Sequence, residues 1–139
     1  MKYDVCMNKK EGNCKMKSSF CSVRGYKGKG VSQITMCHGY GHISGQISCD
    51  IQTGRAIHDS MSEQTERVLK CLEGILEDLG LSLDNIVKCN VFISSMDSFD
   101  DMNKVYLQFF GDECPPARQT VVAGIWDDLD VEISAEFVY

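Results

Sequence analysis

The sequence predicts an α+β fold in which two helices pack on one face of a mixed sheet. Three observations support this prediction: alternating apolar patterns towards both ends of the compact region, two amphipathic segments of helical period between them, and a β-rich run that separates those segments. The expected order is β-β-α-β-α-β-β. Two helices cannot enclose a core by themselves, so they should cover one face of the sheet. The other face then needs a cover, which predicts an oligomer.

Length and charge suggest one ordinary domain. At 139 residues, the chain can bury its own hydrophobic core. Residues 1–25 are polar and aperiodic and are expected to form a poorly ordered N-terminal extension, and residues 26–139 the compact domain, with the glycine-rich GYKGKG as the joint. The net charge of −6 argues against nucleic acid as a general partner, because phosphates require a basic field.

The eight cysteines are not expected to form a disulfide framework. The first residues, MKYDVCMNKK, lack the apolar stretch of a signal peptide, and no run of apolar residues approaches the roughly 20 needed to span a membrane. We therefore expect a cytoplasmic protein whose thiols stay reduced. Neither the cysteines nor the histidines His38, His42 and His58 show metal-ligand spacing, so no metal site is predicted.

The first two strands are expected at residues 31–37 and 38–48. The first run alternates between polar and apolar residues, and HGYG at the start of the second reads as a turn, so the two should form a hairpin. A Thr-Gly turn signal follows within residues 49–56.

Residues 60–79 give the clearest helix. Ser60 and Glu63 have the spacing of a capping box, and Gly80 stands at the C-terminal cap. One apolar stripe runs along it, made of Met61, Val68, Leu69, Leu72, Ile75, Leu76 and Leu79.

A second strand–helix pair follows. Residues 85–94 are apolar on both sides, as in a central strand, with Val87, Cys89, Val91 and Ile93 on one face. Residues 98–111 predict a second helix, with a capping box from Ser98 to Asp101. Its buried stripe is Phe99, Met102, Tyr106 and Phe109.

The last two strands are expected at residues 118–125 and 131–139. The second alternates clearly, with Glu132, Ser134 and Glu136 on its polar side. The short WDDLD link favours pairing of the two as an antiparallel hairpin.

Arg118 is the first candidate for a functional residue. Pro115 and Pro116 stiffen the chain just before it. Its guanidinium is a permanently charged planar fork that matches a carboxylate through two hydrogen bonds. An ordinary salt bridge at a loop end is the alternative interpretation.

Glu132 and the Ser44–Gly45 pair are further candidates. In a tight hairpin, Glu132 would lie near the far end of the strand that carries Arg118, where its carboxylate would orient a water molecule. The alternative is the solvated face of a strand. Ser44 and Gly45 put small side chains inside a strand, which either permits a ligand to approach the backbone or marks a β-bulge.

Several segments together resemble a known family. SGQI and TG in the first half, the helix–strand–helix stretch over residues 63–110, and then PPARQTVV and VEISAE are similar to the RidA (YjgF/UK114) family. The resemblance covers residues 30–139. It implies a chorismate-mutase-like fold of the bacillus type and a barrel-like homotrimer with three clefts between subunits. It also implies hydrolytic deamination, without a cofactor, of 2-imino acids and their enamines to 2-oxo acids and ammonia.

The same resemblance assigns roles to individual residues. Arg118 matches the arginine that binds the substrate carboxylate, and Glu132 the glutamate that positions the attacking water. Ser44 and Gly45 match ligand-lining positions, and Asn103 matches a helix asparagine near the cleft.

Two residues depart from the family pattern. Val31 stands where deaminase members carry a tyrosine, and Thr120 stands where a cysteine is frequent, although its backbone would still bond the ligand. These departures keep a second interpretation open, a trimer that binds small carboxylates such as 2-oxo acids without turning them over. RNA cleavage, claimed for some members, is less favoured because the chain is acidic.

Overall fold

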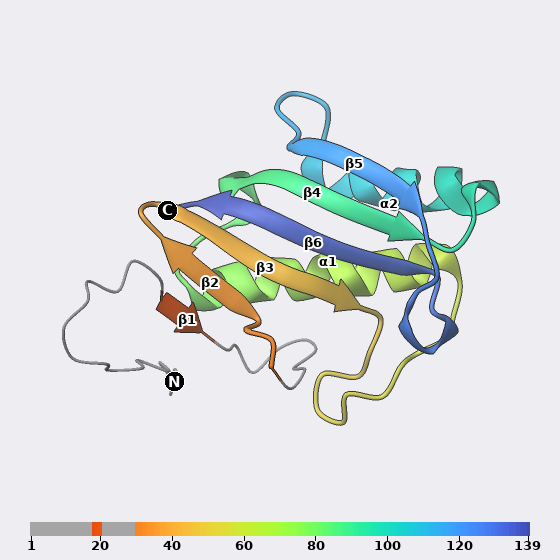
Figure 1. Ribbon diagram of the computed structural model, residues 1–139. Helices are drawn as coiled ribbons and strands as arrows, with labels where there is room; N and C mark the ends of the chain where they lie inside the picture. The colour runs from red at the N-terminus through yellow and green to blue at the C-terminus, as the bar shows by residue number, and fades with distance from the viewer. Residues whose placement is uncertain (1–17, 21–29) are drawn as a thin grey trace.

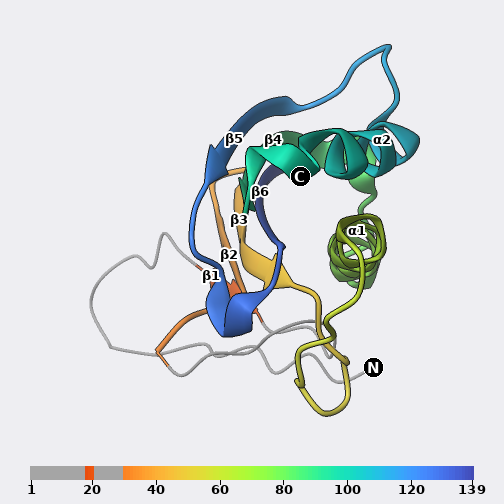
Figure 2. The ribbon, with the colours of Figure 1, turned by 90° about the vertical axis from the view of Figure 1, so that its right-hand side faces the viewer.

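The structure is a computed structural model that describes residues 18–20 and 30–139. Within them, a six-stranded sheet carries two helices on one face (Figures 1 and 2). The helices are α1 (Met61–Asp78) and α2 (Phe99–Phe110), with single turns η1 (Leu83–Asn85), η2 (Met96–Ser98) and η3 (Trp126–Asp128). The strands are β1 (Ser18–Phe20), β2 (Ile34–Cys37), β3 (Tyr40–Ile47), β4 (Ile86–Ile93), β5 (Ala117–Val122) and β6 (Val131–Val138). The predicted α+β class and the placement of both helices on one face are confirmed.

The sheet order is β1-β2-β3-β6-β4-β5. The predicted hairpin of residues 118–125 with 131–139 is wrong, because β4 lies between β5 and β6. Helix α2 forms the crossover from β4 to β5, and a crossover of this kind returns the chain parallel to the strand it left. Strand β6 then inserts between β3 and β4, antiparallel to both. The last described strand is therefore a central one.

Strand β1 was not predicted, because Ser18–Phe20 falls inside the expected extension. It pairs with β2, with Phe20 opposite Ile34. The other residues of the extension, 1–17 and 21–25, lie outside the described residues, so the division into extension and domain stays a prediction.

Helix α1 begins and ends as the sequence predicts. The Ser60 hydroxyl accepts a hydrogen bond from the Glu63 amide (3.3 Å), and the Glu63 carboxylate accepts one from the Ser60 amide (3.1 Å). Past the last turn, Gly80 adopts a φ of +74°, a left-handed conformation that suits glycine. The apolar stripe of α1 is buried against the sheet, with Leu79 at its edge only partly buried.

Two local predictions about the β4–α2 region are wrong. Ser98 makes no side-chain cap on α2, because it is the last residue of η2 and its backbone (φ −97°, ψ 7°) is not extended. Val87 is exposed and Ile86 is buried in its place, since the register between β4 and β6 shifts by one residue between Ile86 and Lys88.

The hydrophobic core lies between the sheet and the two helices. Its largest fully buried side chains include Leu69 and Leu72 of α1, Met102 of α2, and Ile133 and Phe137 of β6. In the part of the chain that the structure describes, both helices pack on this side (Figure 2). No helix there combines the length and apolar character needed to cross a bilayer.

Candidate functional site

Arg118 is held on the helix side of the edge strand β5. Its guanidinium carbon lies 4.6 Å from the centre of the Tyr106 ring and 5.6 Å from that of Phe99. Its Nη1 atom donates a hydrogen bond to Asn103 Oδ1 at 2.7 Å. Phe99, Asn103 and Tyr106 recur at helical spacing and so share one face of α2. Helix α2 thus provides both a ring surface and a polar brace for the cation.

Among the described residues, the groups around Arg118 are uncharged. Within residues 18–20 and 30–139, no carboxylate lies at ion-pair distance from it. Burial raises the pKa of the Cys89 thiol to about 11 and raises the pKa of the neighbouring Tyr106 hydroxyl, so both remain neutral at physiological pH. Asn103 occupies only one of the five N–H donors that a guanidinium has. The remaining donors suit an incoming anion.

Thr120 lies on the same side of β5 as Arg118. It pairs with Val91, a core residue, and residues paired across strands share a face. Its hydroxyl oxygen is buried and has no hydrogen-bond partner among the described residues. We refer to Arg118, Asn103 and Thr120 as the arginine group.

Glu132 lies on the opposite face of the sheet. Its neighbours Val131 and Ile133 point into the core, so the alternation of β6 turns Glu132 outward. The side chain is half-buried, and this desolvation raises the pKa of its carboxyl group. A Cβ atom placed on Gly45 would come within 2.1 Å of Glu132 Oε1. The carboxylate therefore lies directly against the Gly45 backbone, and any side chain at position 45 would have to displace it.

Ser44 and Gly45 form a β-bulge, one of the two interpretations that the sequence allowed. The register between β3 and β6 shifts between Ile43 and Gln46. The Ser44 hydroxyl donates to the carbonyl of Ser32 at 2.6 Å, which places the bulge beside the exposed Val31. The other interpretation, approach of a ligand to the backbone, stays a prediction; at Gly45 it is the Glu132 carboxylate that lies close to the backbone. We refer to Val31, Ser44, Gly45 and Glu132 as the glutamate group.

One chain does not bring the two groups together. Arg118 pairs with Cys89 of β4, whereas Glu132 pairs with Phe92. An offset of three residues along β4 corresponds to roughly 10 Å and reverses the side to which a side chain points. The expectation that Glu132 lies on the strand next to Arg118 is therefore wrong, for the same reason that the predicted hairpin is wrong.

Two contacts of Arg118 were missed as site features. Phe99 and Tyr106 were predicted only as part of the buried stripe of α2. Their spacing with Asn103 was the available signal, since two aromatic rings and one amide on a single helix face suit a cation.

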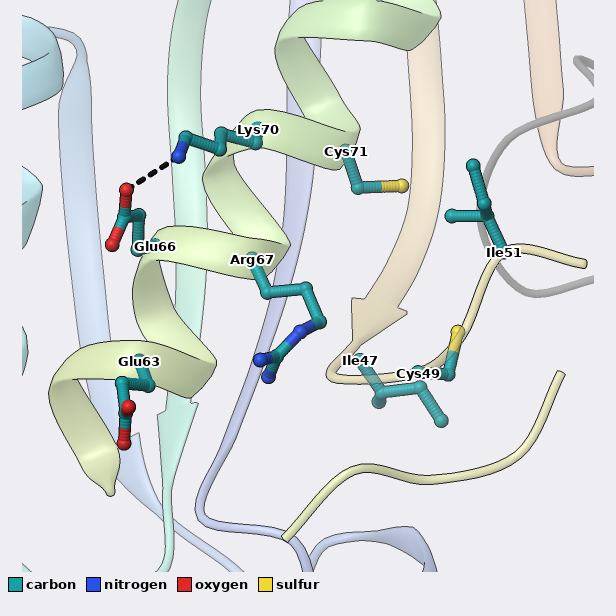
Figure 3. Close-up of a pocket in the computed structure, with 8 residues that line it drawn as sticks. All are labelled: Ile47, Cys49, Ile51, Glu63, Glu66, Arg67, Lys70 and Cys71. Carbon is teal, nitrogen blue, oxygen red and sulfur yellow. Dashed lines mark hydrogen bonds and ion pairs between the residues drawn. The ribbon is translucent and has the colours of Figure 1, made fainter. Parts of the chain in front are cut away.

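A pocket of about 440 Å³ lies elsewhere, between the first half of α1 and the end of β3 (Figure 3). None of the site residues predicted from the sequence lines it. Its lining residues are Ile47, Cys49, Ile51, Glu63, Glu66, Arg67, Lys70 and Cys71. In the described part of the chain, no group of three His, Cys, Asp or Glu side chains is placed to hold a metal ion.

Comparisons with known proteins agree on one family. The sequence profile described as Endoribonuclease L-PSP matches residues 29–138. A RutC family protein of Pyrococcus abyssi is 38% identical over 94 residues, covering 67% of this chain and 73% of the relative. The crystal structure of the Rid-family protein YyfA of Yersinia pestis superposes with a TM-score of 0.83 at 28% identity, covering 88% of this chain and 99% of that one. Escherichia coli TdcF, crystallised with bound serine, gives a TM-score of 0.76 at 31% identity, with coverages of 87% and 98%.

Proposed function

The chain belongs to the Endoribonuclease L-PSP family, which includes the Rid and RutC proteins, and from this premise we propose that it hydrolyses reactive 2-imino acids. The substrates would be 2-iminobutanoate, 2-iminopropanoate and their enamine tautomers, and the products 2-oxo acids and ammonia. A cytoplasmic location, where thiols stay reduced, belongs to the same proposal.

The arrangement of Arg118 is the observation that carries this proposal. The guanidinium is positioned by α2, has no counterion among the described residues, and sits on an edge strand. Such a group suits the carboxylate of a small metabolite, and the serine bound to TdcF is a molecule of this class. Each charge-assisted hydrogen bond would contribute about 1.5–3 kcal/mol to ligand binding.

Arg118 would bind the substrate carboxylate, and the proposed reaction needs one further residue to act as acid and base. The Glu132 carboxylate orients a water molecule and accepts its proton as the water oxygen bonds to the imine carbon. That proton then passes to the nitrogen, which gives a carbinolamine. The hydroxyl proton of the carbinolamine also moves to the nitrogen, the C–N bond breaks as the C=O bond forms, and ammonia and a 2-oxo acid are released. A carboxyl group whose pKa is raised by burial exchanges protons near neutral pH more readily than an exposed one.

This chemistry requires a second copy of the chain. The arginine group and the glutamate group face opposite sides of the sheet within one chain, so a complete cleft combines one group from each of two subunits. A homotrimer would form three such clefts and would cover the outer sheet face.

The direct test combines the protein with a threonine dehydratase and threonine. Release of 2-oxobutanoate is timed with and without the protein, and faster release is expected. No acceleration, in the presence of an active family member as a positive control, would reject the deaminase proposal.

Asn103→Asp is expected to weaken the binding of a ligand carboxylate by Arg118. The new carboxylate would stand where Asn103 Oδ1 now accepts the bond from Arg118, and it would compete with the ligand for the guanidinium. We expect the affinity for 2-oxobutanoate, measured by calorimetry, to fall about 10- to 100-fold. Asn103→Ala, which removes the brace without adding charge, serves as the control and should lose less. Equal affinities for both variants would contradict this role of Arg118.

Glu132→Gln is expected to raise the stability of the fold at pH 7 and to abolish turnover. The folded-state pKa of Glu132 is raised above its ordinary value of 4.5, so ionising this group destabilises the fold as pH rises above that value. The variant should therefore unfold at a higher temperature than the parent at pH 7, and the difference should vanish below about pH 4. Its turnover should be lost. The unfolding temperatures of the variant and the parent are measured from pH 4 to pH 7. A variant less stable than the parent at pH 7 would contradict the raised pKa of Glu132.

A carboxylate-binding protein without turnover is the second candidate. The exposed Val31, which stands where deaminase members carry a tyrosine, favours it. It predicts saturable binding of 2-oxobutanoate that is lost in Arg118→Ala, with no acceleration in the dehydratase assay.

A further inference from the structure

The pocket beside α1 contains two thiols and lies outside both groups of site residues. Figure 3 shows the side chains of Cys71, from α1, and Cys49, just after β3, on the two sides of this space. Ile47 and Ile51 add an apolar wall on the strand side. A volume of about 440 Å³ is in the range that accommodates a small organic molecule.

The charged side chains of the pocket are already paired with one another or with nearby groups. Arg67 donates to both carboxylate oxygens of Asp59, at 2.6 and 3.0 Å, and to the Ser48 hydroxyl. Lys70 is paired with Glu66 (Figure 3). An anionic or cationic ligand would have to displace these partners, so the pocket favours an uncharged molecule.

The two thiols differ in their exposure. Cys49 is only 4% exposed, and burial raises the pKa of its thiol, which keeps it protonated and poorly nucleophilic. Cys71 is partly exposed and lines the same space. Cys71 is therefore the thiol that an electrophile in the pocket would meet.

Cys71 is connected to the glutamate group through a buried side chain. Its Sγ atom donates to Gln46 Oε1 at 3.6 Å, and Gln46 is fully buried. Gln46 Nε2 in turn donates to the backbone carbonyl of Ser44 at 2.8 Å. Ser44 belongs to the bulge that places Gly45 beneath Glu132. The pocket and the bulge thus share one amide side chain.

We propose that Cys71 is a modification site for small uncharged electrophiles, and that its modification loosens the Ser44–Gly45 bulge through Gln46. With an α,β-unsaturated carbonyl compound, the Cys71 sulfur bonds to the β-carbon, the carbon–carbon double bond becomes single, and the α-carbon takes a proton, so the addition needs no oxidant. The thioether has no S–H to donate, and its added volume displaces Gln46. A change in turnover would follow only through Glu132 and so rests on the proposed function; the modification and the loosening do not.

N-ethylmaleimide provides the test. Mass spectrometry of the treated, folded protein should find Cys71 modified and Cys49 unmodified. Amide hydrogen exchange over residues 43–47 should become about tenfold faster after modification. Cys71→Ser keeps a donor for Gln46 but blocks the addition, so its exchange should not respond to the reagent. Cys49→Ser, a matched change in the same pocket, should respond like the parent.

Two results would overturn the proposal: a Cys71 that reacts only after unfolding, or complete modification that leaves exchange over residues 43–47 unchanged. Gln46→Met gives an independent check, because it removes the amide at similar volume and should speed exchange in the untreated protein. If the untreated protein neither turns over imines nor binds 2-oxobutanoate, the proposed function fails, while the exchange measurement still decides the role of Cys71.

Discussion

Arg118→Ala chains mixed with Glu132→Ala chains are expected to regain activity that neither variant has alone. Each variant keeps the residue that the other lacks, and the two groups face opposite sides of the sheet within one chain. A mixed trimer of any composition would contain one cleft with both residues intact. Random mixing of equal amounts should restore about a quarter of the parental activity.

The measurement is 2-oxobutanoate release in the dehydratase assay, after joint refolding of the two variants and confirmation of mixed trimers by native mass spectrometry. A mixture of the parent with the double variant Arg118→Ala/Glu132→Ala gives a control, since it should also retain about a quarter, whereas a cleft contained in one chain would retain about half. Mixed trimers without recovered activity would show that the two residues do not cooperate across an interface.

Arg118→Lys is expected to lower kcat/KM on the order of 100-fold, although the positive charge is kept. Lysine lacks the planar fork, so it would lose a two-point grip on the ligand carboxylate and the stacking on Tyr106 and Phe99. Steady-state kinetics on the imine generated by the dehydratase measure this effect.

The exposed Arg55 offers a matched control, because Arg55→Lys should leave both the kinetics and the unfolding temperature unchanged. An Arg118→Lys variant with parental kcat/KM would mean that a point charge is enough, and the role of guanidinium geometry would be wrong.

Local patterns were sufficient for the helices and for most of the strands. The capping box at Ser60 and the stripe from Met61 to Leu76 depend on residues close in sequence, and both are present in the structure. The pairing of β5 with β4 was not predictable from the short link to β6, because strand partners are chosen by the whole sheet. Likewise, the position of Val87 depends on a bulge against β6 that its own alternating pattern does not reveal.

In the candidate site too, the features set by nearby residues were predictable and those set by strand pairing were not. Arg118, Asn103 and Thr120 were singled out in advance and lie together, since α2 leads directly into the segment before β5. Glu132 was also singled out, but its face of the sheet depends on the central place of β6. Gln46 was noted only as part of the SGQI segment, and its contacts with Cys71 and Ser44 were not predicted because they depend on how α1 packs against β3.

The central place of β6 also affects how the protein is made. Strand β6 is the last described strand to leave the ribosome, yet it joins β3 to β4. Until it arrives, the nascent chain holds two unjoined halves, each with a bare strand edge that attracts other chains. The sheet can therefore be completed only after Val131–Val138 has been made, and a stop codon shortly before Val131 would yield a product prone to aggregation and degradation.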